Sequence, residues 1–268
     1  MAAETGADKP ADAGTAAFSR SIETVPPPGH PVRWFTRWVA ESCSPGADVL
    51  DIGAGCNRSG SLYAIRRRGP HLVGVDPAPS IRRNRVLDER HQQPLEDFAE
   101  THEAAFDVAF AVFVLEHVAD PVAFSRACAR VLRPQGSLFG LTLNKYQYFG
   151  FVTWMTSRLG ITERALATLH RAHGHGHHVP TVYRMNSPGQ VSRHLQEAGF
   201  SSVHFRMFDK PEQYAWYLPG PMKAAPRVWS AAAYRLDNPY LMGHLGFRAI
   251  RDAHTNTATA RAAPSRGS

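Results

Sequence analysis

The stretch VLDIGAG, residues 49–55, decides the fold of this chain. A short apolar run of this kind predicts a buried strand over residues 48–52. The glycines that follow permit a tight turn and let a ligand approach the backbone closely. In an open parallel sheet, ligands bind outside the carboxyl ends of the strands. We therefore expect a binding site at residues 53–55.

Strand-like and helix-like segments alternate through the rest of the chain. Apolar or alternating runs predict further strands at 72–76, 106–111, 137–143, 201–209 and 246–252. Helical spacing or N-capping residues predict helices from Pro31, at 61–68, at 121–132 and from Pro188. This alternation predicts an α/β fold with a Rossmann-like, doubly wound and mostly parallel sheet.

The two ends of the chain and one internal stretch lack these patterns. Residues 1–24 are rich in Ala, Gly, Thr and acids, and residues 255–268 are similar, so we predict a disordered leader and a disordered tail. The remaining residues, 25–254, form a single predicted domain. Within it, residues 145–185 are aromatic at first and then His-rich, which fits a lid or substrate insertion before the sixth strand.

The composition excludes several classes of protein. With 43% hydrophobic and 20% charged residues, the chain is typical of a folded protein. No apolar run reaches the roughly 18 residues of a membrane span. The early acids argue against a secretory signal, and three cysteines without a CxxC pair argue against a disulfide framework, so we expect a cytoplasmic location. The net charge of +7 and the arginines at 66–68 and 82–85 could bind an anionic surface or lie on a solvated face.

Asp76 ends the second predicted strand, one strand–helix–strand unit after the glycines. A carboxylate there can accept two hydrogen bonds from a ribose diol, which predicts a nucleoside ligand. A dinucleotide-binding loop has a third glycine near the pyrophosphate, but Cys56 and Asn57 follow the two glycines here, which argues against NAD. Asp51, directly before the glycines, repels phosphate and suits an ammonium group. A nucleoside joined to an amino acid without phosphate describes S-adenosylmethionine as the cofactor.

Four segments together resemble the class I S-adenosylmethionine-dependent methyltransferases, which have a seven-stranded sheet. These segments are VLDIGAG, GVD, FDVAFAVFVLEHVADP and RVLRPQGSL. The resemblance is to the type 11 branch that includes the ubiquinone-pathway O-methyltransferases, and it covers about residues 30–145. The spaced motifs are specific for the cofactor and not for the substrate.

The resemblance implies roles for individual residues. Arg33 would reach the methionine carboxylate of the cofactor, Asp51 would bind its amino-acid part, and Asp76 would bind its ribose. The other implied cofactor contacts are the loop residues Gly53, Ala54 and Gly55, the adenine-contacting Leu95 and Glu96, and Val112 after the fourth strand. Two alternatives stay open, because Arg33 could be a surface cation and Val112 could be ordinary core.

Two positions bear on the catalytic chemistry. Members of that branch commonly carry a glutamate where this chain has Phe113, and a divalent metal can use it. Because this ligand is missing, we expect no dedicated metal site. His117 is the candidate catalytic base for a hydroxyl acceptor, since a neutral imidazole suits proton removal near pH 7. A structural role, in which His117 orients its loop, is the alternative.

The candidate substrate residues all lie in the insertion: Tyr148, His177, His178, Tyr183 and Arg184. The aromatic run 146–155 could line an apolar pocket, rest on a membrane surface or pack as core. The five histidines at 170–178 could form a substrate-contacting lid, an exposed loop or a metal site. Arg184 could bind an acidic group of the substrate.

These features predict a methyltransferase that uses S-adenosylmethionine and acts on a small-molecule or lipid-like acceptor, with oxygen as the favoured atom. One alternative is a non-catalytic member of the fold that binds the cofactor or a partner. Another is a nucleic-acid methyltransferase, which the net charge of +7 suggests. No Asn/Asp-Pro-Pro-Tyr/Phe segment that would grip a flipped base is present, so no nucleic-acid partner is expected. Peripheral membrane contact and the oligomeric state are left open.

Overall fold

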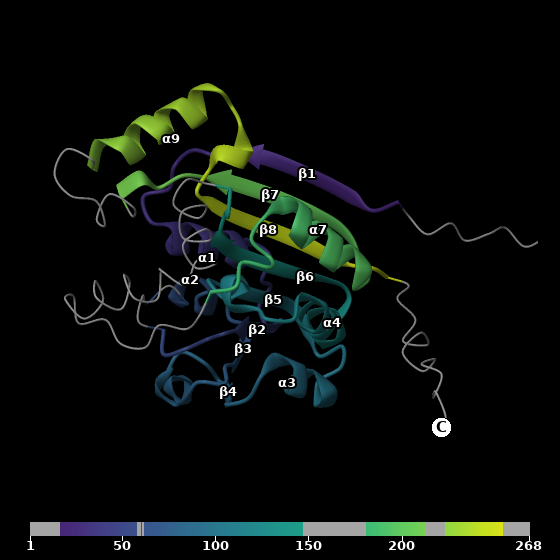
Figure 1. Cartoon of the computed structure of the whole chain (residues 1–268). Helices are drawn as coiled ribbons and strands as arrows, with labels where there is room; N and C mark the ends of the chain where they lie inside the picture. Colours follow the sequence, from purple (N-terminus) through teal and green to yellow (C-terminus); the bar gives the residue numbers. More distant parts are fainter. Residues whose placement is uncertain (1–16, 58–59, 61, 147–180, 213–222, 254–268) are drawn as a thin grey trace, which may run out of the picture.

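An eight-stranded sheet runs through the part of the chain that the computed structural model describes, which is residues 17–57, 60, 62–146, 181–212 and 223–253 (Figure 1). The strand order is β1-β7-β8-β6-β5-β2-β3-β4. Strand β8 is antiparallel to both of its neighbours, and every other pair is parallel. The strands are β1 (Ser19–Thr24), β2 (Asp48–Ile52), β3 (His71–Val75), β4 (Glu89–His91), β5 (Phe106–Val112), β6 (Leu132–Leu143), β7 (Phe200–Phe208) and β8 (His244–Arg251).

Helices cover both faces of this sheet, and each face has its own apolar core. One core joins α1 (Pro31–Glu41) and α2 (Tyr63–Arg66) to strand residues such as Val49 and Phe110. The other core joins α3 (Leu95–Thr101), α4 (Pro121–Val131) and α7 (Pro188–Glu197) to residues such as Leu50 and Ala109. Successive residues of a strand point to opposite faces, so β2 and β5 contribute to both cores. Three short 3-10 helices, η1 (Pro79–Arg83), η2 (Leu115–His117) and η4 (Pro239–Leu241), and the helix α9 (Ala225–Arg235) complete the described elements.

Local signals set several of the helix boundaries. The Asp120 carboxylate accepts hydrogen bonds from two backbone N–H groups in the first turn of α4, and Pro121 follows it. Ser187 caps α7 in the same way, through the backbone N–H of Gln190. Gly199 then follows α7 with a φ of +90°, in the left-handed region where glycine carries no Cβ penalty. The capping predictions for these two helices are confirmed.

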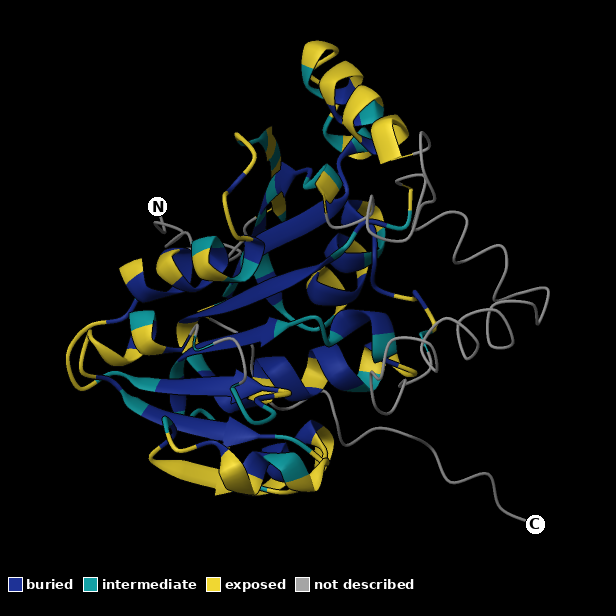
Figure 2. Cartoon of the chain, turned by 90° about the vertical axis from the view of Figure 1, so that its left-hand side faces the viewer, coloured by how far each residue is buried: buried dark blue, intermediate teal, exposed yellow. Residues whose placement is uncertain are grey.

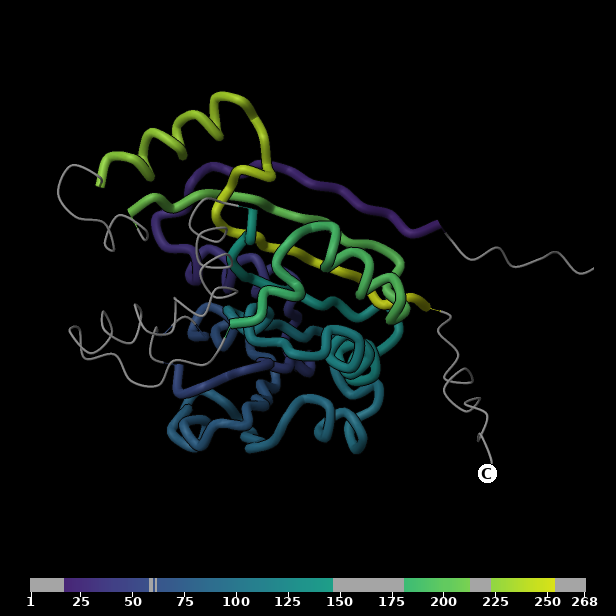
Figure 3. The backbone as a smooth tube through the Cα atoms, viewed as in Figure 1, coloured from purple at the N-terminus to yellow at the C-terminus, as the bar shows by residue number. Residues whose placement is uncertain are grey.

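Two predictions about the fold are corrected. The predicted sheet has seven strands, but β1 adds an eighth, parallel to β7 at the sheet edge; Figure 3 shows the purple β1 alongside the green β7. The predicted disordered leader therefore cannot extend to residue 24. Residues 1–16, 147–180 and 254–268 lie outside the described residues, so the rest of the leader, most of the insertion and the tail stay predictions.

The direction of the chain reverses between β2 and β5, which are neighbours in the sheet. From β2 the chain proceeds outward to β3 and β4, and it then returns to build β5 and β6 on the other side. The crevice at such a switch point, outside the carboxyl ends of the strands, is where open α/β sheets bind ligands. Figure 2 shows the buried strands between helices whose outer faces are exposed.

Candidate cofactor site

The glycine loop lies at the carboxyl end of β2, as predicted. Gly53 has a φ of +71° and donates its N–H to the Val75 carbonyl at 2.8 Å. A Cβ at Gly53 would stand 2.4 Å from Cγ2 of Val114, so only glycine fits there. Gly55 has a φ of +48°, and a Cβ there would meet no atom of the described residues within 4 Å. Packing thus requires Gly53, while Gly55 leaves open space through which a ligand can approach the backbone.

Asp76 holds the other side of this loop. Its Oδ2 accepts a hydrogen bond from the Gly55 N–H at 2.9 Å, and its Oδ1 accepts one from the Ala78 N–H at 2.7 Å. Each carboxylate oxygen can accept a second hydrogen bond. Asp76 is therefore held beside the glycines with one acceptor position free on each oxygen, which fits a ribose diol.

Asp51 is almost completely buried in β2. Burial raises the pKa of its carboxyl well above its usual range, and the nearby negative charge of Asp76 adds to this effect. A buried carboxylate is stable only with a cationic or hydrogen-bonding partner. The site therefore fits a ligand that brings an ammonium group to the α1 side of β2, and the role predicted for Asp51 stays a prediction.

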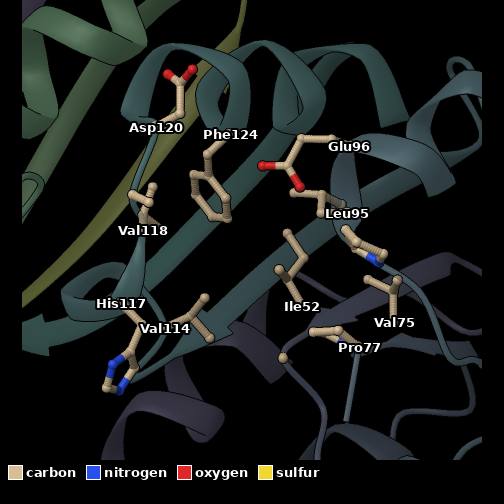
Figure 4. Close-up of a pocket in the computed structure, with 13 residues that line it drawn as sticks. Ile52, Val75, Pro77, Leu95, Glu96, Val114, His117, Val118, Asp120 and Phe124 are labelled. Atoms are coloured by element: carbon tan, nitrogen blue, oxygen red, sulfur yellow. The ribbon is translucent and has the colours of Figure 1, made fainter. Parts of the chain in front are cut away.

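A pocket of about 360 Å³ opens beside the glycine loop, on the sheet face that α3 and α4 cover (Figure 4). Its walls come from the ends of β2 and β3, the first turn of α3, the residues that follow β5 and the first turns of α4. They are mostly apolar; the lining includes Ile52, Gly53, Val75, Pro77, Leu95, Glu96, Val114, His117, Val118 and Phe124. An apolar slot beside the Asp76 carboxylate fits a purine base.

The predicted residues Leu95 and Glu96 line this pocket. They belong to the first turn of α3, a helix that the sequence reasoning did not predict. In Figure 4 the Glu96 carboxylate projects into the pocket from the side opposite Val114. This placement supports an adenine-contacting role for both residues, although the role itself stays a prediction.

His117 also lines the pocket and is partly exposed. It ends η2, which begins two residues after β5, and Figure 4 shows it at the margin of the pocket. The turn that places it begins at Phe113, whose φ of +54° is an outlier for a bulky residue. A strained residue at the carboxyl end of a strand is typical of a functional site. The structure thus brings His117 to the candidate site, and its catalytic role stays a prediction.

Arg33 and Val112 lie outside the pocket lining. Arg33 is exposed in the first turn of α1, where its backbone N–H bonds to the His30 ring. Val112 ends β5 and packs with the core on the α1 face. Both therefore lie on the same side of the sheet as Asp51, where the amino-acid part of a cofactor would bind. Their contacts with a cofactor stay predictions.

A buried polar network, which the sequence reasoning missed, fixes the wall that carries His117. The Thr142 hydroxyl donates to Oε2 of Glu116 at 2.7 Å, and it accepts from Nδ2 of Asn186, also at 2.7 Å. The Glu116 carbonyl accepts the N–H groups of Val182 at 2.8 Å and Tyr183 at 3.3 Å. Burial raises the pKa of the Glu116 carboxyl. The only sequence signal was the position of Glu116 beside His117.

Two predicted substrate residues belong to this wall. Tyr183 is 5% exposed with a φ of +51°, and burial, together with the charge of Glu116, raises its pKa to about 12. Its hydroxyl therefore stays protonated in the interior, which favours a structural role. Arg184 donates from Nη1 to the Ala119 carbonyl at the pocket margin, at 2.7 Å. Tyr148, His177 and His178 lie outside the described residues.

Among the described residues, no group of three or more His, Cys, Asp or Glu side chains is arranged to hold a metal ion. The Glu116 carboxylate is engaged by Thr142. The histidine cluster lies outside the described residues, and the expectation of metal-free catalysis stays a prediction. No helix in the described ranges is long and apolar enough to cross a membrane.

The strand order, the glycine loop, Asp51 in β2 and Asp76 after β3 form the arrangement expected of the class I S-adenosylmethionine-dependent methyltransferases. The chain belongs to the family described as methyltransferase domain, whose model matches residues 29–204. Solved structures share the fold. One is an S-adenosylmethionine-dependent methyltransferase from Archaeoglobus fulgidus, with a TM-score of 0.55 at 16% identity, covering 82% of this chain and 93% of the other. Another, from Mesorhizobium loti, has a TM-score of 0.50 at 17% identity, covering 83% and 99%.

Curated relatives match the central part of the chain. The ubiquinone biosynthesis O-methyltransferase of Sodalis glossinidius is 37% identical over 110 residues, which are 37% of this chain and 43% of the relative. The protein of the same name from Hahella chejuensis is 39% identical over 110 residues, or 38% and 45% of the two chains. The match therefore spans less than half the length of these relatives.

Proposed function

We propose that this protein transfers a methyl group from S-adenosylmethionine to a hydroxyl oxygen of a small-molecule or lipid-like acceptor. The observation that carries the proposal is the pairing of Asp76 and Asp51 around the open Gly55, beside an apolar pocket. The similarity to ubiquinone biosynthesis O-methyltransferases supports oxygen as the acceptor atom. The free cysteines favour a cytoplasmic location.

When bound, S-adenosylmethionine supplies a methyl group that its positive sulfur makes electrophilic. The residues of this chain bind and orient the reactants. Asp76 accepts hydrogen bonds from the ribose, and Asp51 holds the ammonium group. The apolar walls around Leu95 and Phe124 exclude water from the base. Holding the acceptor oxygen in line with the methyl group supplies much of the rate enhancement.

A hydroxyl acceptor must also lose a proton, and we assign the acceptance of this proton to His117. Its ring is partly exposed at the pocket, so it can exchange that proton with solvent. The Glu116 network fixes the backbone of the turn that carries the ring. General-base catalysis of this kind contributes about 10²–10⁴-fold to a rate.

The test is a transfer assay with methyl-labelled S-adenosylmethionine and a panel of phenols, lipids and nucleic acids, with and without exhaustive chelation. We expect label in a phenol or lipid, little effect of chelation, and a loss of about 100-fold or more in His117→Ala. S-adenosylhomocysteine binding should survive that change, because His117 acts on the acceptor. Asp76→Ala should instead weaken S-adenosylhomocysteine binding, which separates the two roles.

Several outcomes would contradict the proposal. Label only in nucleic acid would favour the alternative that the net charge of +7 suggests. Cofactor binding without transfer to any acceptor, including a cell extract, would favour a non-catalytic member of the fold. Activity that chelation abolishes and magnesium or zinc restores would show that the expectation of metal-free catalysis is wrong.

A further inference from the structure

The exposed large hydrophobic side chains of the described residues are all found at one edge of the sheet. That edge is the carboxyl one, where β2, β5, β6 and β7 end, β8 begins and the cofactor pocket opens. Each of these residues belongs to a segment that leaves or enters the sheet there: Tyr63, Val122, Tyr146, Val182, Val228, Leu236 and Tyr240. A one-sided distribution of this kind marks an interaction face.

Helix α9 is the most prominent part of this edge. Its Val228 is 69% exposed and Leu236, directly after the helix, is 68% exposed, the two highest values among those seven residues. The helix lies in the connection from β7 to β8, and in Figure 2 it projects from the body with much of its surface exposed. Val228, Ala232 and Arg235 recur at helical spacing, so they share its outward face.

The inward face of α9 is firmly attached. The Tyr234 hydroxyl accepts the Asp209 N–H at 3.0 Å and donates to the Val25 carbonyl at 3.3 Å. The Trp229 indole N–H donates to the Leu241 carbonyl at 3.0 Å. Because these bonds set the rotation of the helix, the exposure of Val228 follows from the fold rather than from a loose attachment.

Basic residues predominate in this segment. Residues 223–236 carry Lys223, Arg227 and Arg235 and no Asp or Glu, and the exposed Asp237 follows directly. All three cations are exposed. The carboxylate of Glu212, before the helix, lies 3.4 Å from Nζ of Lys210 and also interacts electrostatically with Arg227. A basic helix with protruding aliphatic side chains matches the boundary of a bilayer, where the cations meet anionic headgroups and the aliphatic groups enter the acyl region.

We propose that α9 docks this protein on an anionic bilayer surface, with Val228 and Leu236 inserted and Arg227 and Arg235 on the headgroups. A bilayer fits better than an acidic protein because the exposed face is a projecting helix rather than a groove. Docking there places the membrane at the carboxyl edge of the sheet, the edge at which the cofactor pocket opens. The docking itself does not depend on the proposed function. Only its purpose, which is to bring the enzyme to a lipid-like acceptor, rests on the proposed function.

The test is sedimentation of the full chain with vesicles of phosphatidylcholine alone or mixed with phosphatidylglycerol, without cofactor or acceptor. We expect binding to the anionic vesicles only, weakened by salt. Arg227→Glu/Arg235→Glu should lower the partition coefficient at least tenfold, since each basic residue near an anionic surface contributes several-fold. Val228→Ser/Leu236→Ser should lower it as well and leave the salt dependence in place.

The matched control is Arg67→Glu/Arg68→Glu. These arginines are also exposed, but they follow α2 at the opposite edge of the sheet, just before β3 begins. The control makes the same change in net charge, and we expect it to leave vesicle binding within about twofold. Thermal melts should show that all variants fold. Equal losses in the two arginine pairs, equal binding to both kinds of vesicle, or no binding would overturn the proposal. Because no methyl transfer is measured, these outcomes are independent of the proposed reaction.

Discussion

The buried Asp51 gives a prediction about how cofactor binding depends on pH. Burial and the charge of Asp76 raise its pKa, so at low pH the carboxyl is protonated and offers no charge to an ammonium group. As the pH rises through that pKa, the carboxylate forms. Affinity for S-adenosylhomocysteine should therefore rise with pH over this range, and binding should release a proton.

The size of the effect follows from the burial of the group. A hydrogen bond to a charged partner in a buried site contributes about 1.5–3 kcal/mol. Asp51→Asn should therefore weaken binding by about 10–150-fold at the high-pH end, since 1.4 kcal/mol is about tenfold. The variant should also lose the rise in affinity with pH, because its amide does not titrate.

Calorimetry with S-adenosylhomocysteine, in buffers of different ionisation enthalpy, measures both the affinity and the protons released. Asp48→Asn is the matched control. Asp48 lies at the other end of β2, where its bond to Arg133 lowers its pKa, so this change should leave the pH dependence of binding intact. An affinity that is flat with pH, no released proton, or normal binding by Asp51→Asn would refute the assignment.

Two further predictions concern the scaffold of the site, measured by chemical denaturation. Gly53→Ala should lower the free energy of unfolding by about 2 kcal/mol or more, because alanine is strained at a φ of +71° and its Cβ would stand 2.4 Å from Val114. The control is Gly189→Ala in α7, where a Cβ has space among the described residues, and this change should be neutral or stabilising. Equal effects would contradict the steric account. Thr142→Val should cost about 1–3 kcal/mol and disturb the pocket wall, because buried Glu116 loses its hydroxyl donor. Ser125→Ala removes a buried hydroxyl that has no hydrogen-bond partner among the described residues, so it should lower the free energy of unfolding much less. A similar loss in both variants would count against the network.

Much of the cofactor site could be predicted from the sequence because its determinants are local. Gly53 and Asp76 follow directly on short apolar strands, and the carboxyl ends of parallel strands meet at one edge. The burial of Asp51 follows from its place in the run that precedes the glycines. The N-caps of α4 and α7 bond to N–H groups two or three residues away, so the sequence by itself determined those boundaries as well.

Only the tertiary structure decided the features that depend on distant partners. The strand β1 is polar and shows no periodicity, and it forms because its backbone pairs with β7, more than 180 residues later. The side chain of Glu116 points toward β6 because the Thr142 hydroxyl donates a hydrogen bond to it there, and Asn186 donates in turn to that hydroxyl. No local sequence pattern indicates these contacts. The outward face of α9 is likewise set by the bonds of Tyr234 and Trp229 to other elements. Sequence patterns determine which side of its own strand or helix a residue occupies. Contacts between elements decide which other strands, helices or solvent that side faces.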